Sequence, residues 1–178
     1  IICIIEQLQK LLVCEFITGG GLYAEISDAP LPESLAKEGA LMRDALLRDL
    51  SELNQYQLIS MVDARLLPSD YASKNLMVAA GKFNQVFKKA LKDADLVWLI
   101  APETNGVLLE LTELCLATEE KEGGATFLGC GYDATLAGTS KSLSFEALKS
   151  ANIGTLAVYS GDELMQTAYF NSVAQLNH

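Results

Sequence analysis

Apolar residues along the chain fall into two kinds of segment. Short apolar runs, typical of buried strands, occupy residues 10–17, 56–62, 95–101, 126–130 and 153–159. Between them, apolar positions recur every three or four residues, which predicts helices near residues 35–53, 78–92, 107–115, 133–137 and 142–150. Residues 1–9 and those after Asp162 carry no decisive pattern. The pattern therefore predicts strands and helices in alternation.

The first two predicted helices each have an apolar and a polar side. In the first, we expect four residues at steps of four, four and three to face the core: Met42, Leu46, Leu50 and Leu53. Arg43 falls largely outside that face. In the second helix, a solvated face is predicted for the lysines: Lys82, Lys88, Lys89 and Lys92.

Strands that alternate with helices at this spacing indicate an α/β domain with a mainly parallel sheet. In such sheets, ligands bind beyond the carboxyl ends of the strands, near the point where the strand order reverses. Three loops of unusual composition follow predicted strands, at residues 15–23, 101–106 and 129–133. We expect a ligand site to be built from these loops.

Composition narrows the choice of partners. The 178 residues fit one domain, and half of them are hydrophobic, which excludes global disorder. The net charge is 13 − 23 = −10, so the chain is a poor general binder of nucleic acid or anionic lipid. A positive mean hydropathy of +0.22 is compatible with an apolar interface, and so with a homodimer.

Apolar runs in the chain stay far short of the ~20 residues that a membrane span needs. No secretory signal is visible, and the four cysteines (Cys3, Cys14, Cys115 and Cys130) have no CxxC spacing. We therefore expect reduced thiols in a cytoplasmic protein with no membrane partner. The chain begins with Ile and shows no clear end signal, so we also expect it to be part of a longer polypeptide.

The only histidine is His178, the last residue. A Ser-His-Asp triad, a Cys-His dyad or a histidine-rich metal site is therefore excluded in practice within this chain. No Walker-type phosphate loop occurs either.

The strongest local motif joins a carboxylate to three glycines. Glu15 lies within an apolar strand, and Thr18, Gly19, Gly20 and Gly21 follow shortly after. Backbone N–H groups exposed by such a bend can cradle an anion. Alternatively, the segment is a tight turn in which a neighbouring group satisfies Glu15.

Further polar motifs each allow a second interpretation. Glu103, Thr104 and Asn105 follow a strand, where they can contact a polar ligand, although Thr104 or Asn105 can also cap the next helix. Lys141 taken alone indicates a solvated surface residue, and the Asp63-Ala64-Arg65 charges can pair with neighbours. Residues 129–134 fit a loose dinucleotide fingerprint, but the acidic residue expected ~20 positions later is missing.

Taken together, these motifs resemble the N-terminal part of an ATP-grasp ligase, and more narrowly the tyramine–glutamate ligase-like group of methanofuran biosynthesis. The resemblance runs from about residue 10 to residue 159. It is carried by residues 15–21, 35–39 with Met42, 63–65, 100–106, 128–129, 140–141 and 148–154.

The resemblance implies a preATP-grasp domain over residues 1–160, which is a Rossmann-like three-layer unit, followed at 161–178 by the start of a linker. It also implies ATP-dependent carboxylate–amine ligation through an acyl phosphate, with an amino acid or small amine as substrate. ATP and Mg²⁺ would be held mainly by a C-terminal half that this chain lacks. We therefore expect the chain alone not to turn over ATP, and we assign it no catalytic or metal-binding residue.

Several roles follow from the resemblance. Lys141 matches a lysine that contacts ATP phosphate, although Thr139 and Ser140 replace the usual Ser-Asp before it. Substrate contacts fall to Glu15, which orients its loop, and to Thr18, Gly19, Gly20, Gly21, Glu103, Thr104 and Asn105. Two rival hypotheses stay open: a stand-alone Rossmann-like binding or regulatory domain, and a nucleotide-dependent oxidoreductase that uses residues 129–134.

Overall fold

The computed structural model describes residues 8–23, 29–156, 158–159 and 161. The chain divides into two compact units, Ile1–Tyr132 and Asp133–His178, and each is described by itself. The expected linker at 161–178 lies almost wholly outside the described residues, as do Cys3 and His178. None of the described helices is both long and apolar enough to cross a membrane.

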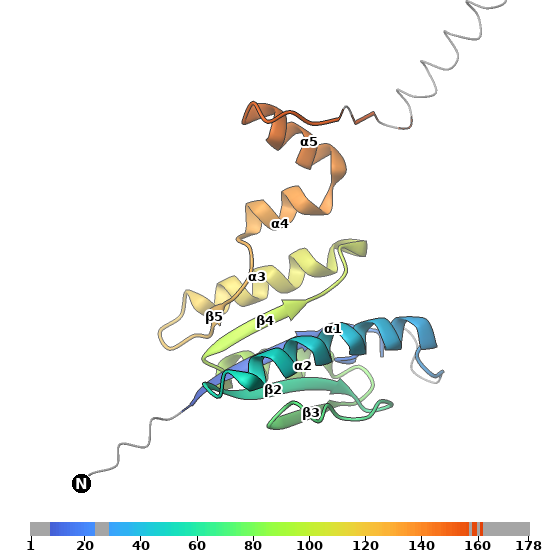
Figure 1. The fold of residues 1–178 in the computed structure, drawn as a ribbon, viewed down its shortest axis with the longest axis vertical. Coiled ribbons are helices and arrows are strands. Elements are labelled where there is room, and N and C mark those ends of the chain that lie inside the picture. Colours follow the sequence, from blue (N-terminus) through green and yellow to red (C-terminus); the bar gives the residue numbers. More distant parts are fainter. Residues whose placement is uncertain (1–7, 24–28, 157, 160, 162–178) are drawn as a thin grey trace, which may run out of the picture. The chain divides into compact units, whose positions relative to one another are not determined.

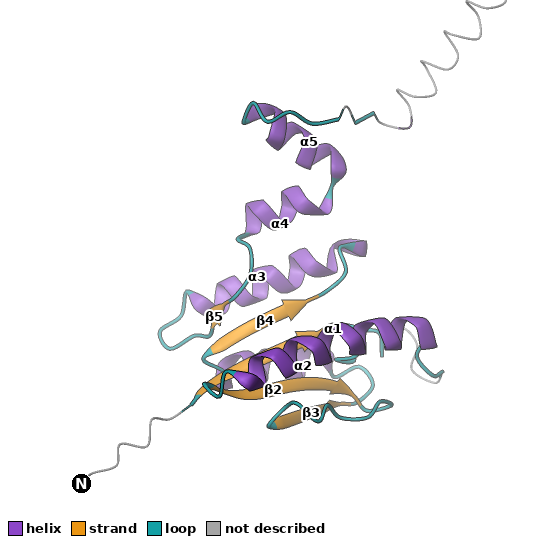
Figure 2. Ribbon diagram, in the orientation of Figure 1, coloured by secondary structure: helices purple, strands orange, loops and turns teal. Residues whose placement is uncertain are grey.

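The first unit is built on a parallel sheet of five strands, drawn in Figures 1 and 2. The strands are β1 (Gln9–Glu15), β2 (Tyr56–Asp63), β3 (Lys74–Val78), β4 (Leu96–Ile100) and β5 (Thr126–Phe127). Their order is β3-β2-β1-β4-β5, and every pairing is parallel. The predicted α/β class with a parallel sheet is confirmed.

Helices cover both faces of this sheet, because successive residues of a strand point to opposite sides. Leu12, Cys14 and their neighbours pack against α2 (Phe83–Asp93) and α3 (Val107–Glu119). Leu11 and Val13 pack on the other face against Leu47 of α1 (Glu33–Glu52). In Figure 1, α1 crosses in front of the strands. The layers are therefore helix, sheet and helix, as expected of a Rossmann-like domain.

Three details of the predicted elements are wrong. Residues 74–78 form β3 on the edge of the sheet, whereas the apolar pattern placed a helix start at 78; the helix begins at Phe83. The fourth predicted strand, 126–130, shortens to β5. No strand forms among the described residues of 153–159, which follow α5 as loop.

The buried stripe of α1 also differs from the prediction. The fully buried residues are Gly39, Arg43 and Leu47. Of the four residues predicted to face the core, Leu46 and Leu50 are half-buried and pack against it, whereas Met42 and Leu53 are exposed. The stripe is displaced by one position because Gly39 and Arg43, which are not apolar, occupy its first two turns. A count of apolar residues could not reveal this displacement of the buried stripe.

The second unit contains two short helices, α4 (Tyr132–Thr139) and α5 (Lys141–Ser150). Ser140 lies between them and is the N-cap of α5, where its Oγ accepts a hydrogen bond from the N–H of Leu143 at 3.3 Å. The helices predicted for this region are confirmed, with slightly wider bounds.

Candidate functional site

The strand order reverses between β1 and β4. From β1 the chain moves outward to β2 and β3, and then returns to β4 on the other side of β1. The carboxyl ends of β1 and β4 are tied together, since the N–H of Phe16 donates to the carbonyl of Ile100 at 2.8 Å. Doubly wound sheets bind their ligands at such a reversal.

A cavity of about 330 Å³ opens at this point. The end of β1, the segment after β4 and the first turns of α1 supply its lining: Glu15, Ile17, Leu35, Glu38, Gly39, Met42, Ile100, Ala101, Pro102 and Glu103. Of the residues predicted to contact substrate, Glu15 and Glu103 are therefore brought to one cavity. Their meeting follows from the adjacency of β1 and β4, which are 80 residues apart in sequence.

The lining of this cavity is both acidic and apolar. Its three carboxylates are Glu15, which is buried, and Glu38 and Glu103, which are exposed, and none of the described lining residues is basic. Leu35 and Met42 are 37% and 42% exposed, so they present apolar surface that the domain itself does not cover. Such a lining favours a cation that carries an apolar body.

Glu15 is a buried carboxylate with a full set of local partners. One oxygen accepts from the N–H and the Oγ1 of Thr18, both at 2.7 Å, and the other accepts from the N–H of Ile17 at 3.0 Å. A carboxylate in this position would be costly to bury without such donors. Glu15 therefore fixes the bend that follows β1. Its assignment to the substrate site stays a prediction.

The three glycines of the bend are tightly packed. The N–H groups of Gly19 and Gly21 donate to the carbonyls of Glu15 and Phe16, both at 2.8 Å, and the N–H of Gly20 donates to Ile17 at 3.3 Å. The expectation that these N–H groups are exposed to cradle an anion is therefore wrong. Gly20 has φ = +91°, and a Cβ there would lie 2.8 Å from a methyl carbon of Val78. The bend is a close-packed turn that only glycine can form.

Gly20 and Gly21 line a second, smaller hollow of about 180 Å³. It lies beside α2 and α3, and its lining includes Phe83, Asn84 and Glu110. Glu15 and Glu103 therefore line one hollow and Gly20 and Gly21 the other, whereas Thr18 and Gly19 line neither.

Thr104 and Asn105 lie outside both linings. They belong to the 3₁₀ turn Thr104–Gly106, in which both are exposed and Asn105 adopts φ = 56°. The alternative interpretation, that one of them caps the next helix, is wrong. Gly106 is the N-cap of α3, and no side-chain hydrogen bond caps it.

The motif at residues 63–65 is an internal clamp. Asp63 is fully buried, and its two oxygens receive Nε and NH2 of Arg65 at 2.9 and 2.7 Å. The Arg65 guanidinium also lies 4.0 Å from the ring centroid of Tyr23 and donates to the carbonyl of Ala29 at 2.7 Å. The hydrogen bonds that the Arg65 guanidinium donates to Asp63 raise the pKa of Arg65. The charges therefore hold the segment after the glycine bend against the end of β2.

Lys141 lies in the second unit, where it is the exposed first residue of α5. Thr139 and Ser140 before it serve the local helices: Thr139 donates to the carbonyl of Leu136 at 2.8 Å, and Ser140 caps α5. The assignment of Lys141 to ATP stays a prediction.

The described residues do not fit a magnesium site or a dinucleotide fingerprint. No group of three acidic, cysteine or histidine side chains among them could hold a metal ion. Within residues 129–134, Gly131 has open space where a Cβ would lie and no positive φ, so its position does not require glycine, whereas a Cβ on Gly129 would meet the ring of Phe127.

Sequence reasoning missed Leu35, Glu38 and Met42 as part of the cavity lining. One signal could have found them, namely Gly39 in the interior of a helix. A Cβ on Gly39 would lie 2.5 Å from Oε2 of Glu15, so the glycine marks the close approach of α1 to the end of β1.

The first unit is thus an α/β domain of the doubly wound class, with a cavity at its reversal point. The sequence model of one protein family, described as the pre ATP-grasp 3 domain, matches residues 56–134. This segment runs from β2 to the start of α4 and includes Asp63, Arg65 and Glu103, whereas the glycine bend and Lys141 lie outside it. The match supports the interpretation that this segment belongs to the N-terminal region of an ATP-grasp superfamily protein. This superfamily suggests an enzyme of the ligase type. Searches of curated proteins and of solved structures give no significant match.

Proposed function

We propose that this chain supplies the amine-binding wall of an ATP-dependent carboxylate–amine ligase. In this reaction ATP would phosphorylate a carboxylate, and the amine would then attack the acyl phosphate and release phosphate. At neutral pH an alkyl amine is mainly an ammonium ion, so it would arrive at the site charged and give its proton to water before it attacks. A site for it needs negative charge and a surface that excludes water.

The acidic and apolar cavity is the observation that carries the proposal. Glu38 and Glu103 present carboxylates to an ammonium group, while Leu35 and Met42 present apolar surface to the rest of the amine. Glu15 does not need to touch the ligand, because its oxygens already accept three hydrogen bonds from the bend. Its role is to hold the floor of the cavity in place.

ATP is assigned here only through Lys141, and Mg²⁺ is assigned to residues outside those described. The absence of a three-acid cluster among the described residues means that no step through the metal is derived for them. Division of labour between an amine-binding domain and a separate nucleotide-binding domain agrees with the family match at residues 56–134. The narrower likeness to tyramine–glutamate ligases is consistent with an amine that has an aromatic body, and it forms part of this proposal.

A titration of the ¹⁵N-labelled chain with tyramine, followed by NMR, tests the site. We expect saturable shifts in the amides of residues 15–17, 38–42 and 100–103. p-Cresol, which lacks the amine, should produce weak shifts or none, because the carboxylates then gain no ion pair.

Glu103→Gln and Glu38→Gln should each weaken tyramine binding about fivefold, the effect expected of a partly exposed ion pair. Glu52→Gln, at the far end of α1, is the matched control and should leave binding unchanged. Shifts confined to other parts of the chain, or equal effects of all three substitutions, would refute the amine site. Tyramine binding without any amine-dependent ADP release from the intact polypeptide would favour a binding module over a ligase.

A further inference from the structure

The segment from Tyr71 to Lys92 differs in charge from the rest of the chain. It contains no Asp or Glu, and it carries five lysines: Lys74, Lys82, Lys88, Lys89 and Lys92. The whole chain has a net charge of −10. This segment forms β3 and most of α2, so the positive charge is concentrated at one edge of the sheet.

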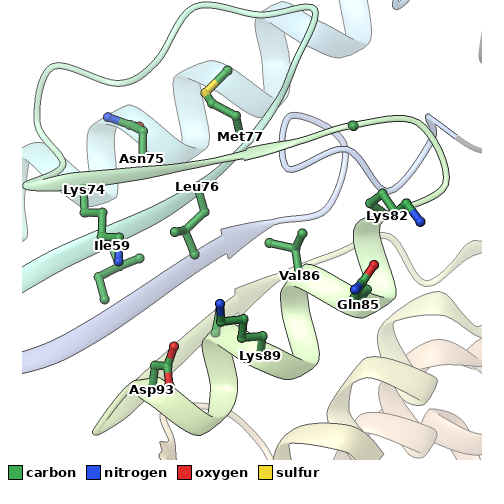
Figure 3. Close-up of a pocket in the computed structure, with 12 residues that line it drawn as sticks. Ile59, Lys74, Asn75, Leu76, Met77, Lys82, Gln85, Val86, Lys89 and Asp93 are labelled. Carbon is green, nitrogen blue, oxygen red and sulfur yellow. The ribbon is translucent and has the colours of Figure 1, made fainter.

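A groove of about 560 Å³ runs between β3 and α2 at that edge. Its floor is apolar and includes Ile59, Leu76, Val86 and Ala90. Figure 3 shows Lys74 and Leu76 on the side of β3 that faces α2, with Asn75 and Met77 on the opposite side. Leu76 and Val86 are only half-buried, so the floor remains accessible.

Three lysines line the groove, and they do not converge on one point. Lys74 and Lys89 point toward each other near one end, where Asp93 also lies, whereas Lys82 is at the other end (Figure 3). No hydrogen bond or ion pair joins the side chains of these lysines to any residue that the structure describes. A single phosphate could engage only part of this set, whereas an extended anion could engage all of it.

β3 is the edge strand of the sheet beside this groove. Among the described residues it pairs with β2 alone, so its outer N–H and C=O groups lack a strand partner there. Lysines on an edge strand discourage pairing with other sheets. That role does not require lysines on α2, nor an accessible apolar floor between the two elements.

We propose that the groove between β3 and α2 binds an acidic segment of a partner polypeptide that also carries apolar side chains. Acidic residues would pair with Lys74, Lys82 and Lys89, and apolar ones would cover Leu76 and Val86. Nucleic acid is disfavoured because the lining contains no aromatic residue for base stacking, and because the remainder of the chain would repel a long polyanion. This site is distinct from the amine cavity and does not depend on the proposed function.

Fluorescence anisotropy with a labelled peptide of alternating Glu and Leu, at physiological salt, tests the proposal. We expect saturable binding that is lost when Lys replaces Glu and weakened when Ala replaces Leu. The double variant K74Q/K89Q should raise the Kd about fivefold. K88Q/K92Q is the matched control, because it removes equal charge from α2 outside the groove, and it should change the Kd less than about twofold.

Absence of saturable binding, or equal weakening by the two double variants, would overturn the proposal. Competition by millimolar inorganic phosphate as effective as by unlabelled peptide would assign the lysines to small anions instead. Light scattering supplies the remaining outcome: a dimer of the wild-type chain that K74Q/K89Q converts to monomer would make a second copy the occupant and would refute the partner assignment.

Discussion

Glu15 shows how one buried carboxylate can fix a bend at the edge of a cavity. Its carboxylate is buried and accepts hydrogen bonds only from the bend that it precedes. Both sequence interpretations, a ligand-facing acid and an acid satisfied by neighbouring backbone, start from the cost of burying this charge. The hydrogen bonds agree with the acid that is satisfied by its neighbours. The position of Glu15 in the cavity lining agrees in part with the ligand-facing acid.

Substitution of Glu15 by Gln should destabilise the domain by about 1–3 kcal/mol, because the new amide group would turn a donor toward the donors of Ile17 or Thr18. Urea unfolding measures the loss. Glu38→Gln, on the exposed side of the same cavity, should leave the free energy of unfolding within about 0.5 kcal/mol of wild type. A wild-type midpoint for Glu15→Gln would show that the charge is not needed by the bend.

Gly39 should not tolerate even a methyl group. A Cβ there would lie 2.5 Å from Oε2 of Glu15 and 3.1 Å from the Cγ2 of Thr18. We expect Gly39→Ala to cost about 1–3 kcal/mol through overpacking, although alanine normally favours a helix. Ala40→Gly in the same helix is the comparison, since it should cost about 1 kcal/mol through propensity alone. Unfolding curves that show Gly39→Ala more stable than wild type would contradict the close contact.

Two buried thiols make stability sensitive to alkali. Burial raises the pKa of Cys115 to about 12 from an ordinary value of 9.0, with the charge of Glu119 adding to it, and burial likewise raises the pKa of Cys14. The folded state therefore holds these protons more tightly than the unfolded state. The contribution of the two thiols to the free energy of unfolding is fully present below pH 9 and is lost as the pH rises toward 12.

The slope that each thiol adds can reach about 1.4 kcal/mol per pH unit in this window. Urea unfolding of wild type and Cys115→Ala at a series of pH values measures it. We expect the variant to lose less stability between about pH 9 and 10 than wild type does. Parallel curves for the two proteins would show that Cys115 does not titrate with unfolding.

At the scale of elements, apolar periodicity predicted most helices and strands. Besides the strand expected over 153–159, which does not form among the described residues, it failed at β3 and for part of the face of α1. β3 is a short edge strand whose sequence, KNLMV, alternates only weakly, because one face lies over an open groove. In α1 the buried stripe contains a glycine and an arginine, and a pattern of apolar residues cannot identify either. Both failures occur where tertiary contacts, not hydrophobicity, decide which side faces inward.

The clamp at residues 63–65 should hold the segment after the glycine bend against β2. Replacing Arg65 by Met removes the bidentate ion pair with Asp63 and the contact with Tyr23, and leaves a buried carboxylate without its cation. We expect a loss of about 3–5 kcal/mol, together with faster hydrogen exchange of residues 18–23 than of α3. Arg48→Met removes an exposed pair with Asp49 and should have little effect. Equal costs for the two substitutions would argue against the clamp.

At the scale of the whole molecule, the parallel α/β class and the convergence of Glu15 with Glu103 could be predicted from sequence. Both depend on one rule, that the loops after parallel strands lie at one edge of the sheet. The separation of Gly20 and Gly21 from the cavity that Glu15 and Glu103 line could not be predicted, because it depends on the tertiary packing of the bend. The contribution of Leu35 and Met42 to the cavity lining was not predicted, because both residues belong to α1 and not to a loop that follows a strand.

The proposed ligase function gives Lys141 a role that ATP kinetics can test. Lys141→Ala should raise the KM for ATP or lower kcat by about tenfold if its ammonium group binds a phosphate, and Lys141→Arg should restore part of the loss. Lys149→Ala, on the last turn of the same helix, is the control. ATP kinetics unaffected by Lys141→Ala would remove this residue from the nucleotide site.

The place of β1 has a consequence for how the protein can be dissected. β1 is the middle strand and pairs with both β2 and β4, yet it lies upstream of the segment that matches the family. A fragment that began at residue 56 would lack β1 and α1, and would consist of the pairs β2–β3 and β4–β5 with no strand between them. Any smaller expressible piece of this protein must therefore keep the strand that ends at Glu15.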